Sequence, residues 1–378
     1  MVFTVLSDVL ASNIQRLARV MDSKVVLPVF QTHLFELGME DGALRVTASD
    51  GDLFLQVSMK VSDWSVSGGD VTRWCVHHRF MREFMSGFKK QPLVFHVSKD
   101  HGVEVEYPNG SIRFVYTDAD AFPFFKSPDV EFEKSVLLPS GLLHEDLNRT
   151  SPFILRSEFT KVLSAVCLNF KSDGMDVVST DRRILAKVTH PDIRTSSEHM
   201  MLLPPKPVAV LRSLLLNENG DVSVGAADGI GVVRGQDWCL SFRLLTDNYL
   251  RYNSVISRKC TTEVVVSKNA LHDSIRRVLL MGDGIQRTVR MVTDAEKLVL
   301  STVDRIQRKS AEEEVACLSS GPAVSIYLDG EGVCKMLQQF SSEKVVLKMK
   351  DASSPMLIVP EQKAEKEDFL MLIAPSWQ

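Results

Sequence analysis

A threefold internal repeat is the feature that most constrains how this chain can fold. Three segments carry alternating apolar residues that run into an aspartate, at 44–50, 175–181 and 298–304. The aspartates lie 131 residues apart (50 to 181) and 123 residues apart (181 to 304). Another alternating stretch follows each segment, so each predicts a strand, a turn and a second strand. A chain of 378 residues with this repeat is expected to form several similar domains rather than one large core.

Helical patterns flank each of these strand–turn–strand units, one before the unit and one after it. The predicted helices cover 9–20, 79–88, 141–150, 207–216, 269–281 and 332–340. A β-rich stretch follows each second helix, and linkers are expected at 121–128 and 254–259. We therefore expect an α+β fold of three tandem domains, each with two helices packed on antiparallel sheets. The expected boundaries are 1–128, 129–257 and 258–378.

Composition narrows the class of protein further. With 44% hydrophobic and 24% charged residues, the chain has ordinary globular composition. No apolar run reaches the roughly 18 residues of a membrane span, and the first residues do not have the pattern of a secretion signal, so we expect a cytoplasmic protein. The six cysteines are scattered singly, which favours reduced thiols over disulfides or a zinc site. A formal net charge of −4 means that any DNA binding must come from local charge.

Four segments of the sequence together resemble the bacterial DNA sliding clamp family, the beta subunit of the replicative DNA polymerase III. They are 24–30, 46–50, 180–186 and 372–378, and they occur in the order found in the family. The resemblance extends over essentially the whole chain. It implies a head-to-tail homodimeric ring that encircles duplex DNA and serves as a processivity factor. The implied protein is not an enzyme, needs no cofactor or metal, and does not enter a membrane.

The resemblance also implies the partners. They are double-stranded DNA of any sequence, a second copy of the chain, the alpha subunit of DNA polymerase III, the clamp loader and other proteins with a clamp-binding motif. Helices that line DNA should be basic, and four of the six predicted helices carry an excess of basic residues, although such residues are also typical of solvated helix faces. The expected DNA-facing residues are Arg16, Arg19, Lys24, Arg79, Arg82, Arg149, Lys206, Arg212, Arg276, Arg277 and Arg287.

Family members bind short partner peptides in an apolar cleft between the second and third domains. Matched onto the motifs of this sequence, the cleft is expected to involve Leu163, Thr180, Arg182, Arg183, Leu185, Leu250, Val255, Leu372, Ile373, Ala374, Pro375 and Ser376. An apolar groove of this kind suits leucine and aromatic anchors, although the same apolar residues are also typical of a strand core.

The sequence departs from the family at several of these cleft positions. The family usually has Gly-His-Arg where this chain has 182–184, a proline at Leu250 and an arginine at Ser254. It usually has methionines at Ala374 and Ser376. The departures predict a cleft whose preferred peptide differs from the family's.

Ring closure is expected to pair an edge strand of the first domain with an edge strand of the third domain of the other copy. Phe114 and Tyr116 match the family's apolar contact on one side, and Leu280 and Met281 match it on the other. Either pair could instead belong to an internal core.

Two other classes of function compete with that of a clamp. For an enzyme, the His77–His78 pair lacks a third ligand at metal spacing, the run 50–52 lacks the rest of a calcium loop, and the run 229–231 is an incomplete phosphate motif. No G-x-S-x-G motif marks a serine nucleophile. A β-rich interaction module without DNA encirclement is the main alternative, and it should carry a secretion signal and neutral or acidic helices.

Overall fold

The computed structural model of the chain describes residues 1–21, 27–68, 70–123, 135–157, 159–256, 259–282, 287–304 and 306–376. The chain packs into two compact units. Unit 1 contains residues 1–144 and 206–244, and unit 2 contains residues 145–205 and 245–378. All three positions at which the chain passes from one unit to the other lie inside the expected second domain, so the division at 1–128, 129–257 and 258–378 stays a prediction.

One order of elements recurs three times along the chain. The first copy contains β1 (Val2–Leu6), α1 (Ser7–Leu17), β2 (Thr32–Leu37), β3 (Ala43–Ser49), β4 (Leu53–Lys60), β5 (Ser62–Ser65), β6 (Arg73–His77), α2 (His78–Ser86), β7 (Pro92–Ser98), β8 (Gly102–Tyr107) and β9 (Gly110–Phe114). The second contains β10 (Val136–Pro139), α3 (Ser140–Thr150), β11 (Val166–Lys171), β12 (Gly174–Thr180), β13 (Ile184–His190), β14 (His199–Leu203), α4 (Pro205–Leu215), β15 (Asp221–Ala227), β16 (Ile230–Arg234) and β17 (Trp238–Arg243). The third contains β18 (Thr262–Ser267), α5 (Lys268–Leu279), β19 (Thr288–Thr293), β20 (Lys297–Asp304), β21 (Lys309–Ser320), β22 (Ser325–Asp329), α6 (Gly330–Leu337), β23 (Lys344–Met349), β24 (Met356–Pro360) and β25 (Asp368–Ile373).

All six predicted helices are confirmed, with their ends shifted by at most three residues. The observed helices start one or two residues earlier than the apolar pattern indicates, and at α5 and α6 a capping side chain sets the start. The Ser267 side chain accepts a hydrogen bond from the backbone of Ala270 at the start of α5, and Asp329 caps α6 in the same way through Gly332. The spacing of apolar residues does not predict these caps, because the capping residues are polar.

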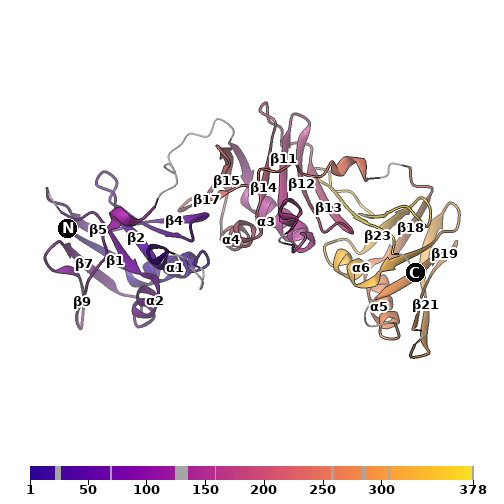
Figure 1. Cartoon of the computed structure of the whole chain (residues 1–378), viewed down its shortest axis with the longest axis horizontal. Coiled ribbons are helices and arrows are strands. Elements are labelled where there is room, and N and C mark those ends of the chain that lie inside the picture. Colours follow the sequence, from indigo (N-terminus) through magenta and orange to yellow (C-terminus); the bar gives the residue numbers. More distant parts are fainter. Residues whose placement is uncertain are drawn as a thin grey trace. The chain divides into compact units, whose positions relative to one another are not determined.

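Buried residues spaced one turn apart fix each helix on its sheet. Leu10, Ile14 and Leu17 bury one face of α1, and α5 buries Leu271 and Ile275 in the same way. Figure 1 shows α1 and α2 packed side by side in the first copy and α5 and α6 in the third. Each pair therefore leaves its outer face available to solvent.

The sheets join successive copies of the repeat within each unit. In unit 1, β4 pairs antiparallel with β17, with Leu53 opposite Phe242. In unit 2, β13 pairs antiparallel with β25, with Leu185 opposite Leu372. In both cases the strand after the aspartate turn pairs with the last strand of the next copy. The result is an eight-stranded sheet in unit 1 and a twelve-stranded sheet in unit 2.

The repeated aspartates build the same turn three times. The Oδ1 atom of Asp50, of Asp181 and of Asp304 accepts hydrogen bonds from the backbone N–H groups two and three residues further on, at 2.7 to 3.0 Å. In the first two copies the residue after the aspartate has a positive φ, 104° at Gly51 and 81° at Arg182. The predicted strand, turn and strand at each repeat is therefore confirmed, and the first two turns require a backbone conformation that favours glycine.

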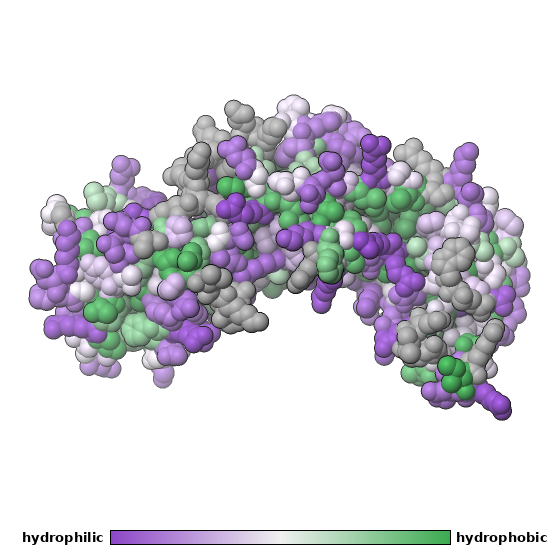
Figure 2. Space-filling view, viewed as in Figure 1, coloured by the Kyte–Doolittle hydropathy of each residue, from purple (hydrophilic) through white to green (hydrophobic). Residues whose placement is uncertain are grey.

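The molecular surface is mostly polar. On the face shown in Figure 2, hydrophilic side chains dominate and hydrophobic ones reach the surface in separate patches. None of the helices in the described ranges is long and apolar enough to cross a membrane. The six cysteines are free thiols, and four of them are buried.

Candidate functional site

The basic residues expected to face DNA fall into distinct environments. Arg19, Arg79, Arg82 and Arg276 are exposed and enter no ion pair within the described ranges. Arg16 pairs with Asp237, Lys206 with Asp50, Arg277 with Glu313 and Arg287 with Glu331. Arg212 is half-buried on α4, and Lys24 lies outside the described residues.

A cavity in unit 1 brings two of these arginines to α4. It measures about 460 Å³ and is lined by Arg16 of α1 and Arg19 just after it, and by Ser213 of α4 and Asn217 just after it. The Arg16 guanidinium makes two hydrogen bonds, of 2.7 and 2.9 Å, to the Asp237 carboxylate on the same wall. Glu218 lines the cavity as well, so two carboxylates balance the charge of the two arginines there, although Arg19 itself enters no ion pair within the described ranges.

A second cavity, in unit 2, lies between α5 and α6. It measures about 550 Å³, and its lining includes Arg276, Arg287 and Lys335 together with Leu280. Glu331 shares this lining and holds Arg287 in an ion pair. Arg276 and Lys335 leave the wall with excess positive charge, which suits a phosphate oxygen.

Arg149 does not present its charge to solvent, and the expectation for it is corrected here. Only 12% of its side chain is exposed, because the guanidinium bridges Glu145 and Glu367 and lies 5.0 Å from the centroid of the Phe369 ring. The two glutamate carboxylates neutralise the positive charge of Arg149 within the fold. The sequence shows only that Arg149 lies on a helix, not that both acidic residues reach it.

The same region contains a buried polar cluster that the sequence did not reveal. Asp146, His190 and Glu367 have ligand-type atoms within 4.8 Å of one another, close enough to hold a metal ion. The His190 Nε2 atom lies 2.8 Å from Asp146 Oδ2. Burial disfavours the imidazolium, but the hydrogen bond and the charge of Asp146 outweigh burial and raise the pKa of His190. With Arg149 also bound to Glu367, these groups form an internal ion network.

The apolar residues expected for partner binding do come together in unit 2. Leu163, Leu185 and Leu372 belong to one cluster, in which Leu185 and Leu372 are buried and Leu163 is half-buried. Val255 and Leu250 are each 39% exposed on the segment that follows β17. Thr180 is buried, and its hydroxyl donates a hydrogen bond to the carbonyl oxygen of Ile184. Apolar surface therefore continues from the buried cluster to exposed side chains.

Ile373 does not belong to this surface. The expectation that its side chain lines the cleft is wrong, because the side chain points away from the cluster. Successive strand residues point to opposite faces, so Ile373 lies on the face opposite Leu372. Ile373 is fully buried and pairs with Ile184, whose side chain lies close to Gly332 of α6. As the cross-strand neighbour of Ile184, it lies on the same face of the sheet as Ile184, toward α6.

The end of β25 and the β12–β13 turn are tied together beside the cluster. The backbone N–H of Ala374 donates to the Arg183 carbonyl at 2.8 Å, and an Arg183 guanidinium N–H donates to the Ser376 hydroxyl at 3.2 Å. Arg182 donates to the Thr160 hydroxyl at 2.7 Å. Residues Ala374, Pro375 and Ser376 are half-buried and follow Leu372 directly.

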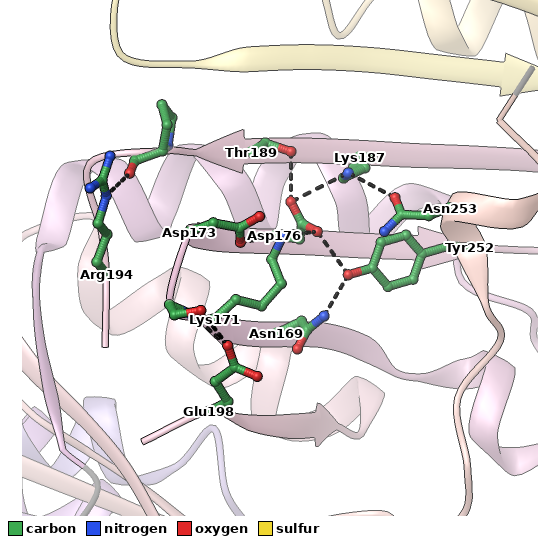
Figure 3. A network of polar contacts seen from close by, with 12 residues as sticks. Asn169, Lys171, Asp173, Asp176, Lys187, Thr189, Arg194, Glu198, Tyr252 and Asn253 are labelled. Carbon is green, nitrogen blue, oxygen red and sulfur yellow. Dashed lines mark hydrogen bonds and ion pairs between the residues drawn. The ribbon is translucent and has the colours of Figure 1, made fainter. Parts of the chain in front are cut away.

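A polar network under the cluster holds the segment around Tyr252 in place (Figure 3). The fully buried Asp176 carboxylate accepts hydrogen bonds from Thr189 at 2.7 Å and from the Tyr252 hydroxyl at 2.8 Å. Lys171 and Lys187 form ion pairs with it at 3.1 and 3.4 Å. Burial opposes ionisation, but these hydrogen bonds and charges lower the pKa of Asp176. This network could not be predicted from the sequence, because its members come from β11, β12, β13 and the η5 turn (Tyr252–Ser254).

Replacing Tyr252 with phenylalanine should lower the free energy of unfolding by about 1 to 2 kcal/mol, because Asp176 and Asn169 each lose a hydrogen-bond partner. Urea denaturation at pH 7.5 measures the loss. Tyr249→Phe is the matched control, since the Tyr249 hydroxyl makes one long hydrogen bond of 3.5 Å to Val178 and its loss should cost under about 0.5 kcal/mol. Equal losses in the two variants would show that the network does not hold Tyr252.

The residues expected at the dimer interface differ in exposure. Leu280 and Met281 follow α5 and are 74% and 43% exposed. Phe114, at the end of edge strand β9, is half-buried against Phe80 of α2 with ring centroids 4.9 Å apart. Tyr116 is half-buried, and its neighbour Val115 is 88% exposed.

The chain is similar in sequence to known bacterial sliding clamps. Residues 253–375 match the family model described as DNA polymerase III beta subunit, C-terminal domain. The beta sliding clamp of Bacillus subtilis is 21% identical over 384 residues, covering 99% of both chains. That of Synechocystis is 24% identical over 377 residues, covering 93% of each. The predicted resemblance to bacterial DNA sliding clamps is confirmed.

Solved structures of sliding clamps have the same fold as this chain over its full length. The sliding clamp of Pseudomonas aeruginosa, solved bound to griselimycin, superposes with a TM-score of 0.89 at 18% identity and covers 100% of both chains. The sliding clamp of Bacillus subtilis gives 0.87 at 18% identity, covering 100% of this chain and 99% of that one. The clamp fold, with helices on antiparallel sheets, therefore holds for this chain.

Proposed function

We propose that this protein is a DNA sliding clamp that encircles duplex DNA and tethers polymerase and repair factors to it. The observation that carries the proposal is similarity to beta sliding clamps over 99% of the chain, together with the same fold over its full length. In this role the protein acts in the cytoplasm and holds its partners at DNA without catalysing a reaction or using a cofactor. The three copies of the repeat correspond to domains at about 1–128, 129–257 and 258–378.

The sheet pairings support head-to-tail closure by two copies. The strand after the aspartate turn pairs with the last strand of the next copy twice within the chain, as β4–β17 and β13–β25. By the same rule β21 would pair with β9 of a second chain. β9 is a sheet edge, and β21 pairs on one side with β20 through 309–316 and on the other with β18 only through 317–320. Both strands thus have free edges for this junction.

The helices of two such chains would enclose enough space for DNA. Six α-helices occur in the described ranges, so two chains supply twelve. At about 10 Å between neighbouring axes they give a circumference of about 120 Å and leave an opening of roughly 28 Å. A duplex with grooves of about 12 and 6 Å passes through an opening of this size with room for water.

We propose that the exposed arginines on these helices and directly after them attract the DNA backbone. Arg19, Arg79, Arg82 and Arg276 lead this set, because no carboxylate in the described part of the chain pairs with them. Arg277 and Arg287 keep more than half of their side chains exposed, so their surface ion pairs can exchange for phosphate. Arg149 is left out of the set because it is enclosed.

We propose that partner peptides bind at the apolar cluster of unit 2. Leu163, Leu185 and Leu372 offer the apolar base, and Val255 and Leu250 offer exposed apolar contacts at its side. A leucine or aromatic side chain of a peptide gains most of its affinity from such contacts. Polymerase III alpha subunit, clamp loader and repair factors would share this surface.

The test is retention on DNA of different topology. The protein is loaded onto a nicked circular plasmid by the cognate clamp loader and ATP, and retention at high salt is compared with that on the same plasmid cut once. Encirclement predicts retention on the circle and loss from the linear form, since electrostatic binding weakens with salt on both. Equal retention on the two forms, with a known clamp loading normally, would overturn the proposal in favour of an interaction module.

A further inference from the structure

We propose that Arg182 and Arg183 make the partner-binding surface select a linear peptide that carries a carboxylate beside its apolar anchors. The inference rests on the proposed function, because it names the chemistry of the partner at that surface. It is carried by four features of the β12–β13 turn: the position of the two arginines, their hydroxyl partners, their uncompensated charge and the strained backbone of Arg182.

The two arginines lie on either side of the apolar cluster. The Arg182 side chain reaches Thr160, which directly precedes the η4 turn (Lys161–Ser164) that carries Leu163. Arg183 reaches Ser376, four residues after Leu372. A peptide seated on Leu163 and Leu372 would therefore have a guanidinium group within reach at each side.

Neutral partners hold both guanidinium groups in position. The Thr160 and Ser376 hydroxyls accept one hydrogen bond each, at 2.7 and 3.2 Å. A guanidinium carries five N–H donors, so most donors of each arginine stay available. Hydroxyl partners orient the side chain without cancelling its charge, and such prior ordering lowers the entropy that a ligand must remove on binding.

The charge of the turn is not balanced by nearby acids. Within the described ranges neither Arg182 nor Arg183 forms an ion pair. The adjacent carboxylate, Asp181, uses Oδ1 to accept the backbone N–H groups of Arg183 and Ile184. Lys161, on the η4 turn, is exposed and adds to the positive charge. A carboxylate is the complementary group, and guanidinium binds it in a planar two-point geometry.

The backbone of Arg182 adds an independent argument. Its φ is 81°, and the corresponding turn residue in the first copy of the repeat is Gly51, with φ 104°. Glycine adopts this conformation without steric strain, whereas a residue with a Cβ does not. Strained residues concentrate at binding and catalytic sites, which points to a use for the arginine side chain itself.

The test uses two probe peptides with the same leucine and phenylalanine anchors, one with aspartate next to the anchors and one with asparagine there. Fluorescence anisotropy with the full-length protein measures the dissociation constant of each at 50 and 500 mM NaCl. We expect the aspartate peptide to bind about fivefold more tightly at low salt. Screening should reduce the preference to under about twofold at high salt.

Two variants and a control locate the effect. Arg182→Gly removes the guanidinium and relieves the backbone strain, so it should lose part of the aspartate preference while its melting temperature stays equal to or above that of the wild type. Arg183→Gln should lose the rest. Arg194→Gln is the matched control, because it removes one exposed positive charge beyond the opposite end of β13 and should keep the full preference.

The possible failures are distinct. Equal affinity of the two peptides for the wild type, or an aspartate preference that survives in the Arg182→Gly/Arg183→Gln double variant, would overturn this inference and leave the peptide site intact. Failure of both peptides to bind would overturn the proposed peptide site and this inference with it.

Discussion

Replacing Leu280 with glutamate should turn the proposed dimer into a monomer. Leu280 is 74% exposed just after α5, at the end expected to meet the second copy. A carboxylate enclosed in an apolar contact without a partner costs several kcal/mol, which corresponds to a dimer dissociation constant raised at least about hundredfold. Sedimentation equilibrium at micromolar protein should show the wild type as a dimer and the variant as a monomer. Retention on circular DNA should be lost with the dimer.

Leu216→Glu is the matched control for this change. Leu216 is 65% exposed and follows α4 by one residue, as Leu280 follows α5. It belongs to the second copy of the repeat, whereas the expected junction joins the first and third copies, so the variant should remain dimeric. A Leu280→Glu protein that sediments as a dimer with wild-type affinity would place the contact elsewhere and remove Leu280 and Met281 from the interface.

Acid should destabilise the protein through His33. Its imidazole is buried beside His78, with ring centroids 6.2 Å apart, and neither ring nitrogen has a hydrogen-bond partner in the described structure. Burial, reinforced by the nearby charges of His78 and His77, lowers the pKa of His33 to about 3. In the unfolded chain the imidazole has a pKa of about 6.5, so below this pH the unfolded state binds a proton that the folded state does not. The free energy of unfolding is therefore highest above pH 6.5 and declines as the pH falls toward 3. At pH 5 the loss is about 2 kcal/mol.

His33→Leu tests this assignment. The variant should be at least as stable as the wild type at pH 7.5, because it buries no unpaired polar atom, and it should lose less stability between pH 7.5 and 5. Urea denaturation at the two pH values gives the difference, and the other titrating groups cancel in the comparison. Parallel losses in the two proteins would show that another group, such as the Asp146–His190 pair, is responsible.

Local features of the fold could be predicted from the sequence because they depend on neighbouring residues. The six helices follow from apolar spacing, and the three aspartate turns follow from a carboxylate that binds the next backbone N–H groups. The predicted start of α5 lay one residue too late, because the Ser267 cap acts through one hydrogen bond to the backbone and leaves no mark in the apolar spacing. The gathering of Leu163, Leu185 and Leu372 was predicted only through family resemblance, since nothing local links them.

Features that depend on distant residues could not be predicted. The basic character of Arg149 is cancelled by Glu367, which is 218 residues away in the chain. The Asp176 network joins four elements, and each residue alone reads as an ordinary surface polar group. The face of the sheet on which Ile373 lies depends on the register of β25 against β13. Both faces of β25 are buried and apolar, so the pattern of apolar residues does not determine this register.

The β13–β25 pairing has a consequence during synthesis on the ribosome. Ile184 pairs with Ile373, so β13 keeps an unsatisfied edge until 189 further residues (184 to 373) have been translated. Closing a contact of this span is slow and leaves strand edges open to wrong partners. Leu372 and Ser376 also belong to the surface proposed for partner peptides, so a nascent chain that has not reached Asp368 lacks that surface. Products of interrupted translation would then be unable to compete with finished chains for polymerase.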